Sequence, residues 1–203
     1  MSGRTRIGCG LLAGMIASLL VPSVADAASC PLPSTVDATM NNTVLDVDGQ
    51  VAASKAGGYL QIPFTVPAGT TGIRVRYSYD QPGDAANPGG QCNPPSSTNT
   101  LDMGVYQPKA TPSSPIFESD DERGWSGSAV KDLAISPNGF TSDAVYNSSR
   151  KAYVSGKTTR AYRPGPIQPG EWAVELGLAY IAPNSADDSD GIHYHVLVET
   201  STW

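Results

Sequence analysis

Hydrophobic residues recur at every second position in short runs along this chain, and clusters of turn-forming residues separate the runs. Between Gly72 and Tyr79, for example, the apolar residues alternate with Arg74, Arg76 and Ser78. A β-strand with one buried and one solvated face has this period of two. No stretch after residue 27 keeps a helical period, so the pattern predicts strands.

The predicted strands are residues 44–47, 58–66, 71–79, 101–106, 130–135, 151–154, 170–181 and 192–200. Turn segments such as Pro67-Ala68-Gly69 and Pro164-Gly165-Pro166 lie between them and supply the backbone angles that a chain reversal needs. About eight short strands with regular breakers predict an all-β fold, an antiparallel, jelly-roll-like β-sandwich.

The first 27 residues have the composition of a secretory signal peptide. Arg4 and Arg6 precede an uncharged apolar run, and small residues end the segment. The run contains glycine and proline and is short for a bilayer crossing, so we expect no membrane span. We expect cleavage after Ala27 and a secreted or periplasmic mature chain that starts at Ala28.

Length and charge limit the domain organisation and the partners. A chain of 203 residues with 39% hydrophobic content supports one core, and we assign residues 28–57 to an N-terminal strand and linker and 58–203 to the sandwich. Loss of Arg4, Arg6 and Asp26 with the leader changes the net charge from −6 to −7. The Lys and Arg residues form no cluster larger than the pair Arg150-Lys151, which argues against nucleic acid as a partner.

Two cysteines, Cys30 and Cys92, remain after the leader is removed. Disulfides persist in secreted proteins, and we expect these two residues to pair and to tie the N-terminal segment to a Gly/Pro-rich loop. On the chain-entropy model such a bond contributes about 4 kcal/mol. The alternative is lipidation of Cys30, which follows small residues as in a lipoprotein signal and which would leave Cys92 unpaired.

Five sequence elements follow one another in a recognisable order. They are a VP-G-T turn in 64–70, a strand end rich in Tyr and Asp at 77–80, an LD-G-Y strand at 101–106, RGWSG at 123–127, and a PGP-PG-W-V-LGL element at 164–178. In this order they resemble the pre-peptidase-like N-terminal β-sandwich that precedes the catalytic domain in secreted metal-dependent phosphoesterases of the PHP (polymerase and histidinol phosphatase) superfamily.

The resemblance implies an accessory domain. In that family a catalytic barrel follows the sandwich and opens with a D-x-H-x-H metal-binding strand, whereas this sequence ends at Trp203. We therefore carry over no catalytic residue and expect no enzymatic activity and no cofactor. The residues that carry the resemblance are interpreted as fold markers: Asp102, Gly104, Arg123, Trp125, Gly127 and Trp172.

The segment Gly124-Trp125-Ser126-Gly127-Ser128 comes near the G-x-S-x-G elbow of serine hydrolases. The fifth position is serine, and no helical pattern follows, although the elbow requires a strand-to-helix turn. We interpret the segment as a tight turn that places Trp125 against the sandwich while Arg123 lies along its surface.

Two side-chain groups are candidates for metal ligands. His193 and His195, two apart on a predicted strand, share a face, and a third ligand is offered by Asp187, Asp188 or Asp190. The same aspartates, followed by a glycine, resemble part of a calcium loop without its bidentate glutamate. A solvated strand face and a polar hairpin connection are the simpler explanations, and we expect no bound metal.

The sequence therefore predicts a secreted, non-catalytic accessory or interaction domain. Its partner stays open, and the resemblance implies a PHP-type phosphoesterase domain as one candidate. Two alternatives stay open. One is a truncated or split metal-dependent phosphoesterase. The other is a carbohydrate-binding module for an extracellular glycan, in which Trp125, Tyr106 or Tyr162 stacks on sugar rings.

Overall fold

The computed structural model of the chain describes residues 30–33, 37–80, 99–141, 153–181 and 191–202. The expected signal peptide lies outside these residues. Within them no helix is long and apolar enough to cross a membrane.

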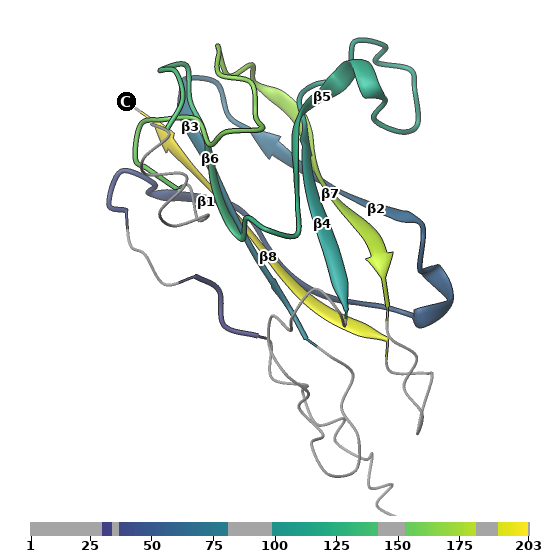
Figure 1. Ribbon diagram of the computed structural model, residues 1–203. Coiled ribbons are helices and arrows are strands. Elements are labelled where there is room, and N and C mark those ends of the chain that lie inside the picture. The colour runs from purple at the N-terminus through teal and green to yellow at the C-terminus, as the bar shows by residue number, and fades with distance from the viewer. Residues whose placement is uncertain (1–29, 34–36, 81–98, 142–152, 182–190, 203) are drawn as a thin grey trace, which may run out of the picture.

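Two antiparallel four-stranded sheets pack face to face, as Figure 1 shows. Sheet A has the order β1-β8-β3-β6 and sheet B the order β2-β7-β4-β5, which is the strand order of an eight-stranded jelly roll. The strands are β1 (Asn42–Val51), β2 (Tyr59–Val66), β3 (Thr70–Tyr79), β4 (Thr100–Tyr106), β5 (Glu122–Gly127), β6 (Asp132–Ile135), β7 (Gly170–Tyr180) and β8 (Ile192–Thr202). Two 3₁₀ turns, η1 (Ala53–Lys55) and η2 (Ser119–Asp121), complete the elements. The predicted all-β sandwich is confirmed.

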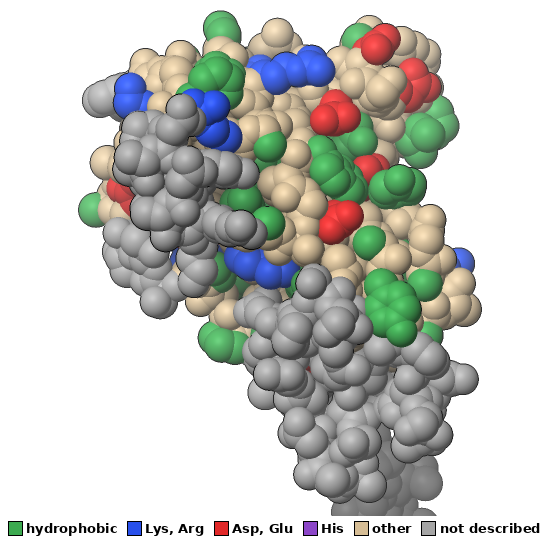
Figure 2. All heavy atoms as spheres, in the orientation of Figure 1, with side chains coloured by type: hydrophobic (Ala, Val, Ile, Leu, Met, Phe, Trp, Pro, Cys, Tyr) green, Lys and Arg blue, Asp and Glu red, His purple; other side chains and the backbone are tan. Residues whose placement is uncertain are grey.

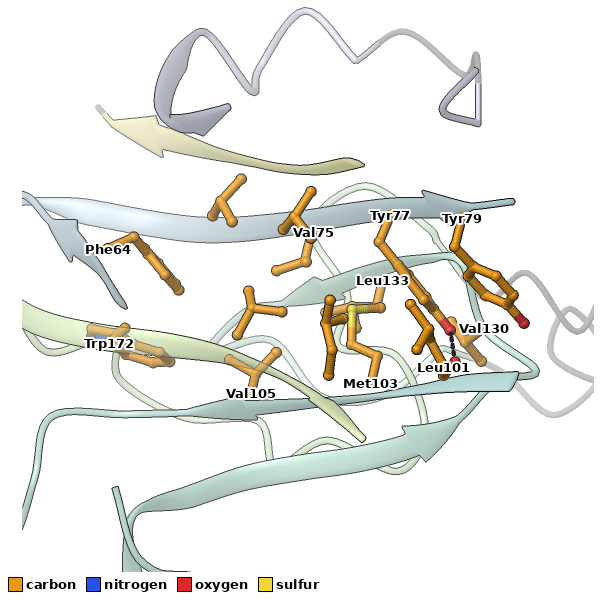
Figure 3. Packing of buried hydrophobic residues seen from close by; sticks show 14 of the residues in the cluster. Phe64, Val75, Tyr77, Tyr79, Leu101, Met103, Val105, Val130, Leu133 and Trp172 are labelled. Carbon is orange, nitrogen blue, oxygen red and sulfur yellow. Dashed lines mark hydrogen bonds between the residues drawn. The ribbon is translucent and has the colours of Figure 1, made fainter. Parts of the chain in front are cut away.

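The core lies between the two sheets and is filled by inward-facing apolar residues of every strand except β5 (Figure 3). Trp172 of β7 is fully buried and packs against Phe64 of β2, with ring centroids 6.5 Å apart. The hydroxyl of Tyr77, also fully buried, crosses from sheet A to sheet B and donates to the carbonyl of Leu101 at 2.8 Å. The alternation that predicted the strands therefore also selects the residues that fill the core.

Two local predictions differ from the structure. Residues 123–127, interpreted as a tight turn, lie in strand β5, which pairs with β4. Register shifts at Met103/Gly104 and Val105/Tyr106 interrupt that pairing. Because the pairing is irregular, the sequence of β5 does not show the alternation of apolar and polar residues that marks a regular strand. Of the predicted strand 151–154, only Tyr153 and Val154 are described, and neither belongs to a strand.

The N-terminal segment 30–33 lies against the outer face of sheet A. Ser78 donates to the carbonyl of Cys30 at 2.7 Å, and Arg76 donates to the carbonyl of Pro33 at 3.0 Å. Cys30 is buried at 4% exposure. Its expected disulfide partner, Cys92, lies outside the described residues, so the pairing stays a prediction.

Candidate functional site

The outer face of sheet B carries an aromatic platform built on two glycines. Trp125 of β5 pairs with Gly104 of β4, and its indole extends over that glycine toward Gly177 of β7. A Cβ placed on Gly104 would lie 2.5 Å from Cε3 of Trp125, and one on Gly177 would lie 2.6 Å from Cη2. Both distances are too short for a real contact. The two middle strands therefore lack side chains where the indole lies against the sheet.

Tyr59 of β2 completes the platform from the other edge of sheet B. Its ring meets the indole of Trp125 edge-on, with centroids 6.2 Å apart and planes at 70°. The Tyr59 side chain is 70% exposed, the most exposed large hydrophobic side chain among those described. The aromatic pair thus spans all four strands and faces solvent.

A fixed polar network lies beside the platform. Glu175 of β7 is 5% exposed, and its two oxygens accept hydrogen bonds from the Tyr106 hydroxyl at 3.0 Å and the Gln61 amide at 2.8 Å. Gln61 also exchanges two hydrogen bonds with the backbone of Phe117, both at 3.1 Å. Burial and the Glu175 carboxylate raise the pKa of Tyr106 well above its ordinary value, so the hydroxyl keeps its proton and donates.

The platform and the network border an open groove of about 600 Å³. Ile116 and Phe117 form its other wall, and Phe117 is held by contacts with Tyr106 and Ala173. On the right of Figure 2, over β4, β5 and β7, hydrophobic and acidic side chains lie side by side. The groove is lined by Tyr59, Gln61, Tyr106, Ile116, Phe117, Glu122, Trp125 and Glu175.

Three polar groups in the groove are free to bind a ligand. Among the described residues, none forms a hydrogen bond with the Glu122 carboxylate, the Tyr59 hydroxyl or the Trp125 indole N–H. The groove therefore offers a hydrogen-bond acceptor in Glu122, a donor in Trp125 and a hydroxyl in Tyr59 that can do both, all around an apolar surface. Small-molecule sites combine apolar walls with a few placed polar groups in this way.

A smaller hollow of about 80 Å³ lies against the same aromatic pair and includes Asp102. Burial raises the pKa of the Asp102 carboxyl, while Lys131 and the backbone N–H of Ser128 lower it. Because the two hollows share Tyr59 and Trp125, the aromatic pair lies between two acidic side chains, Asp102 and Glu122.

Of the three aromatic residues predicted to stack on sugars, two belong to this groove and one does not. Trp125 and Tyr106 line it. Tyr162 is 1% exposed, and its hydroxyl is 2.8 Å from Ser126 Oγ, so the prediction of a stacking role for Tyr162 is wrong. Tyr59 and Glu175 were not predicted, although the alternation Tyr59-Leu60-Gln61 already places Tyr59 and Gln61 on one face.

The proposed fold markers have distinct positions. Trp172 is in the core, and Gly127, with φ of +60°, occupies a conformation that glycine adopts readily. Arg123, expected along the surface, is only 7% exposed and donates to the carbonyls of Arg163 and Gly165, each at 2.8 Å. That expectation is wrong because the guanidinium satisfies loop carbonyls that would otherwise be buried without partners.

The two histidines lie on sheet A and have separate carboxylate partners. Asp80 accepts from the backbone N–H of His193 at 2.7 Å and lies 3.2 Å from its Nδ1. The Nε2 of His195 lies 2.7 Å from Asp46. No group of three potential metal ligands occurs in the part of the chain that the structure describes. The other candidate ligands, Asp187, Asp188 and Asp190, lie outside that part.

A further hollow of about 460 Å³ is lined by small and hydroxyl-bearing residues, with Met40 and Ile135 among them. It contains no aromatic or charged side chain. The groove on sheet B therefore offers the more specific set of chemical groups.

No family model matches the chain, and neither a curated protein nor a solved structure matches it. The association with PHP-type phosphoesterases thus stays a prediction from sequence motifs.

Proposed function

We propose that this domain is a non-catalytic carbohydrate-binding module whose ligand lies in the groove on sheet B. The observation that carries the proposal is the aromatic pair on the outer face of sheet B: the partly exposed indole of Trp125 lies over Gly104 and Gly177, and the exposed ring of Tyr59 meets it edge-on. A sugar ring has an apolar C–H face that packs on an aromatic ring and a rim of hydroxyls that needs polar partners. The platform supplies the aromatic surface for the C–H face, and the polar groups beside it supply hydrogen-bond partners for the hydroxyls.

The rigidity of the network supports selective binding. Glu175, Gln61 and Tyr106 hold one another by hydrogen bonds before a ligand arrives. A preorganised site loses little conformational entropy on binding, which improves affinity without further contact area. The groove walls are likewise fixed, because Phe117 is anchored by its backbone to Gln61.

The same contacts favour binding over hydrolysis. A glycosidase uses two carboxyl groups, one as acid and the other as base or nucleophile. Both oxygens of Glu175 are engaged by Gln61 and Tyr106, and Glu122 is the other carboxylate in the lining. The predicted secretion signal would bring such a module to extracellular glycans, and the resemblance to accessory sandwiches agrees with a role beside a separate catalytic domain.

A pair of matched tyrosine variants tests the proposal. Tyr59→Ala removes a platform ring, while Tyr180→Ala removes a tyrosine that is 46% exposed and lies outside the groove. On a glycan array, followed by titration calorimetry with the best ligand, we expect Tyr59→Ala to weaken binding about tenfold and Tyr180→Ala to leave it unchanged. An array without any bound glycan, or equal affinity of wild type and Tyr59→Ala, would refute the proposal.

A further inference from the structure

The groove on sheet B is acidic. Its ionisable carboxyl groups belong to Glu122 and Glu175, and no Lys or Arg is among its lining residues. The adjacent small hollow adds Asp102. The protein as a whole carries a net charge of −6. A ligand with carboxylate or sulfate groups would therefore be repelled at this face.

Two lysines that contact aromatic rings of this domain, Lys109 and Lys131, are already engaged. Lys109 lies 4.7 Å from the ring centroid of Phe117 but pairs with Glu171 at 3.2 Å. Lys131 packs on the ring of Tyr79 at 3.7 Å, and burial lowers its pKa to about 7. Neither ammonium group lines the groove, so neither neutralises Glu122 there.

Glu122 is placed to bind a positive charge that comes with the ligand. Its side chain is partly exposed and has no hydrogen-bond partner among the described residues, and it lies at the edge of the groove with Trp125. An ammonium group that enters the groove toward Glu122 would also meet the aromatic side chains that line it. Cations are attracted to such faces, most strongly to that of tryptophan.

We propose that the groove selects glycans with free amino groups, that is, oligosaccharides of deacetylated amino sugars. This inference rests on the proposed carbohydrate-binding function and adds the class of ligand. The sugar ring packs on Trp125 and Tyr59, and its ammonium group pairs with Glu122. A basic peptide has the same charge but lacks the flat ring that the platform accommodates, so the observations favour the glycan.

The test compares glucosamine oligomers of one length, fully deacetylated or fully N-acetylated, by titration calorimetry near pH 5.5. At that pH the sugar amines carry protons and ordinary glutamates are ionised. We expect the deacetylated oligomer to bind at least about tenfold more tightly, which corresponds to about 1.4 kcal/mol. Added salt should reduce this preference because it screens charge pairs.

Two variants test whether Glu122 causes the preference for the deacetylated oligomer. Glu122→Gln should reduce the preference for the deacetylated oligomer to about twofold, because glutamine keeps the size of the side chain and removes its charge. Asp120→Asn removes the same charge from an exposed residue outside the groove and should preserve the preference. A preference that survives in Glu122→Gln, or that falls equally in both variants, would overturn the assignment to Glu122.

The outcomes separate this inference from the proposed function. If the two oligomers bind equally and Tyr59→Ala weakens both, the groove binds carbohydrate and the selection for amines is wrong. If neither binds, the selection is wrong, and the array decides whether the carbohydrate function stands. If oligolysine binds as tightly as the deacetylated oligomer and Tyr59→Ala does not weaken it, the ligand is a basic peptide and the inference is overturned.

Discussion

Replacement of Gly104 by alanine tests whether this glycine lets the indole of Trp125 lie against sheet B. The new Cβ would lie 2.5 Å from Cε3 and 2.9 Å from Cζ3 of the indole, whereas the next neighbour, the carbonyl oxygen of Gly124, lies at an ordinary 3.5 Å. Gly104 is not among the described residues with positive φ, so alanine meets no backbone obstacle of its own. The clash with the indole therefore dominates.

The expected loss of stability is about 2 kcal/mol. Forcing a side chain into an occupied space costs about 1–3 kcal/mol. If the indole instead swings into solvent, re-exposure of about 100 Å² of its surface costs about 2.5 kcal/mol at 25 cal/mol per Å². Relative to glycine, alanine lowers the conformational entropy of the unfolded chain, which offsets about 0.5 kcal/mol of this loss of stability.

A double-mutant cycle measures this coupling. Urea unfolding followed by circular dichroism would be compared for wild type, Gly104→Ala, Trp125→Ala and the double variant. Without the indole, alanine at position 104 should be neutral or stabilise by about 0.5 kcal/mol, which gives a coupling energy of about 2 kcal/mol. Gly104→Ala should also weaken ligand binding, since the platform is displaced.

An equal loss of stability from Gly104→Ala with and without Trp125 would refute this reasoning. The cost would then arise from the strand itself, and the glycine would not be needed for the indole. Unchanged m values across the cycle are required for the comparison, because a change in m reports a change in the denatured or native ensemble.

Two further predictions concern the charged side chains of Asp132 and Lys131. Asp132 accepts two hydrogen bonds, of 2.9 and 2.7 Å, from the guanidinium of Arg74, which is 1% exposed. Asp132→Asn removes the compensating charge and should lower the free energy of unfolding by about 3–5 kcal/mol. A loss below about 1 kcal/mol in urea unfolding would contradict this. Burial lowers the pKa of Lys131 from 10.5 to about 7, so between these values the unfolded chain binds more protons and stability rises with pH. From pH 7 to 8.5 the wild type should gain about 1.5 kcal/mol relative to Lys131→Met, and parallel stability curves for the two proteins would contradict the cause.

The fold class could be predicted because it depends on local alternation. Ile73, Val75 and Tyr77 stand at every second position, and each is fully buried in the sandwich. Strand β5 could not be predicted in the same way. Its pairing with β4 is interrupted by two register shifts, and its residues include two glycines and a serine, which read as a turn.

The sequence by itself determined the two-layer β architecture, because side chains one residue apart on a strand point to opposite faces and the apolar face must be covered. Only the tertiary structure determines which residues come together in the groove. Tyr59, Gly177, Gly104 and Trp125 belong to four different strands, and the order β2-β7-β4-β5 brings them into one platform. That order depends on long-range pairing between strands, and no local pattern along the chain encodes which outer-face residues become neighbours.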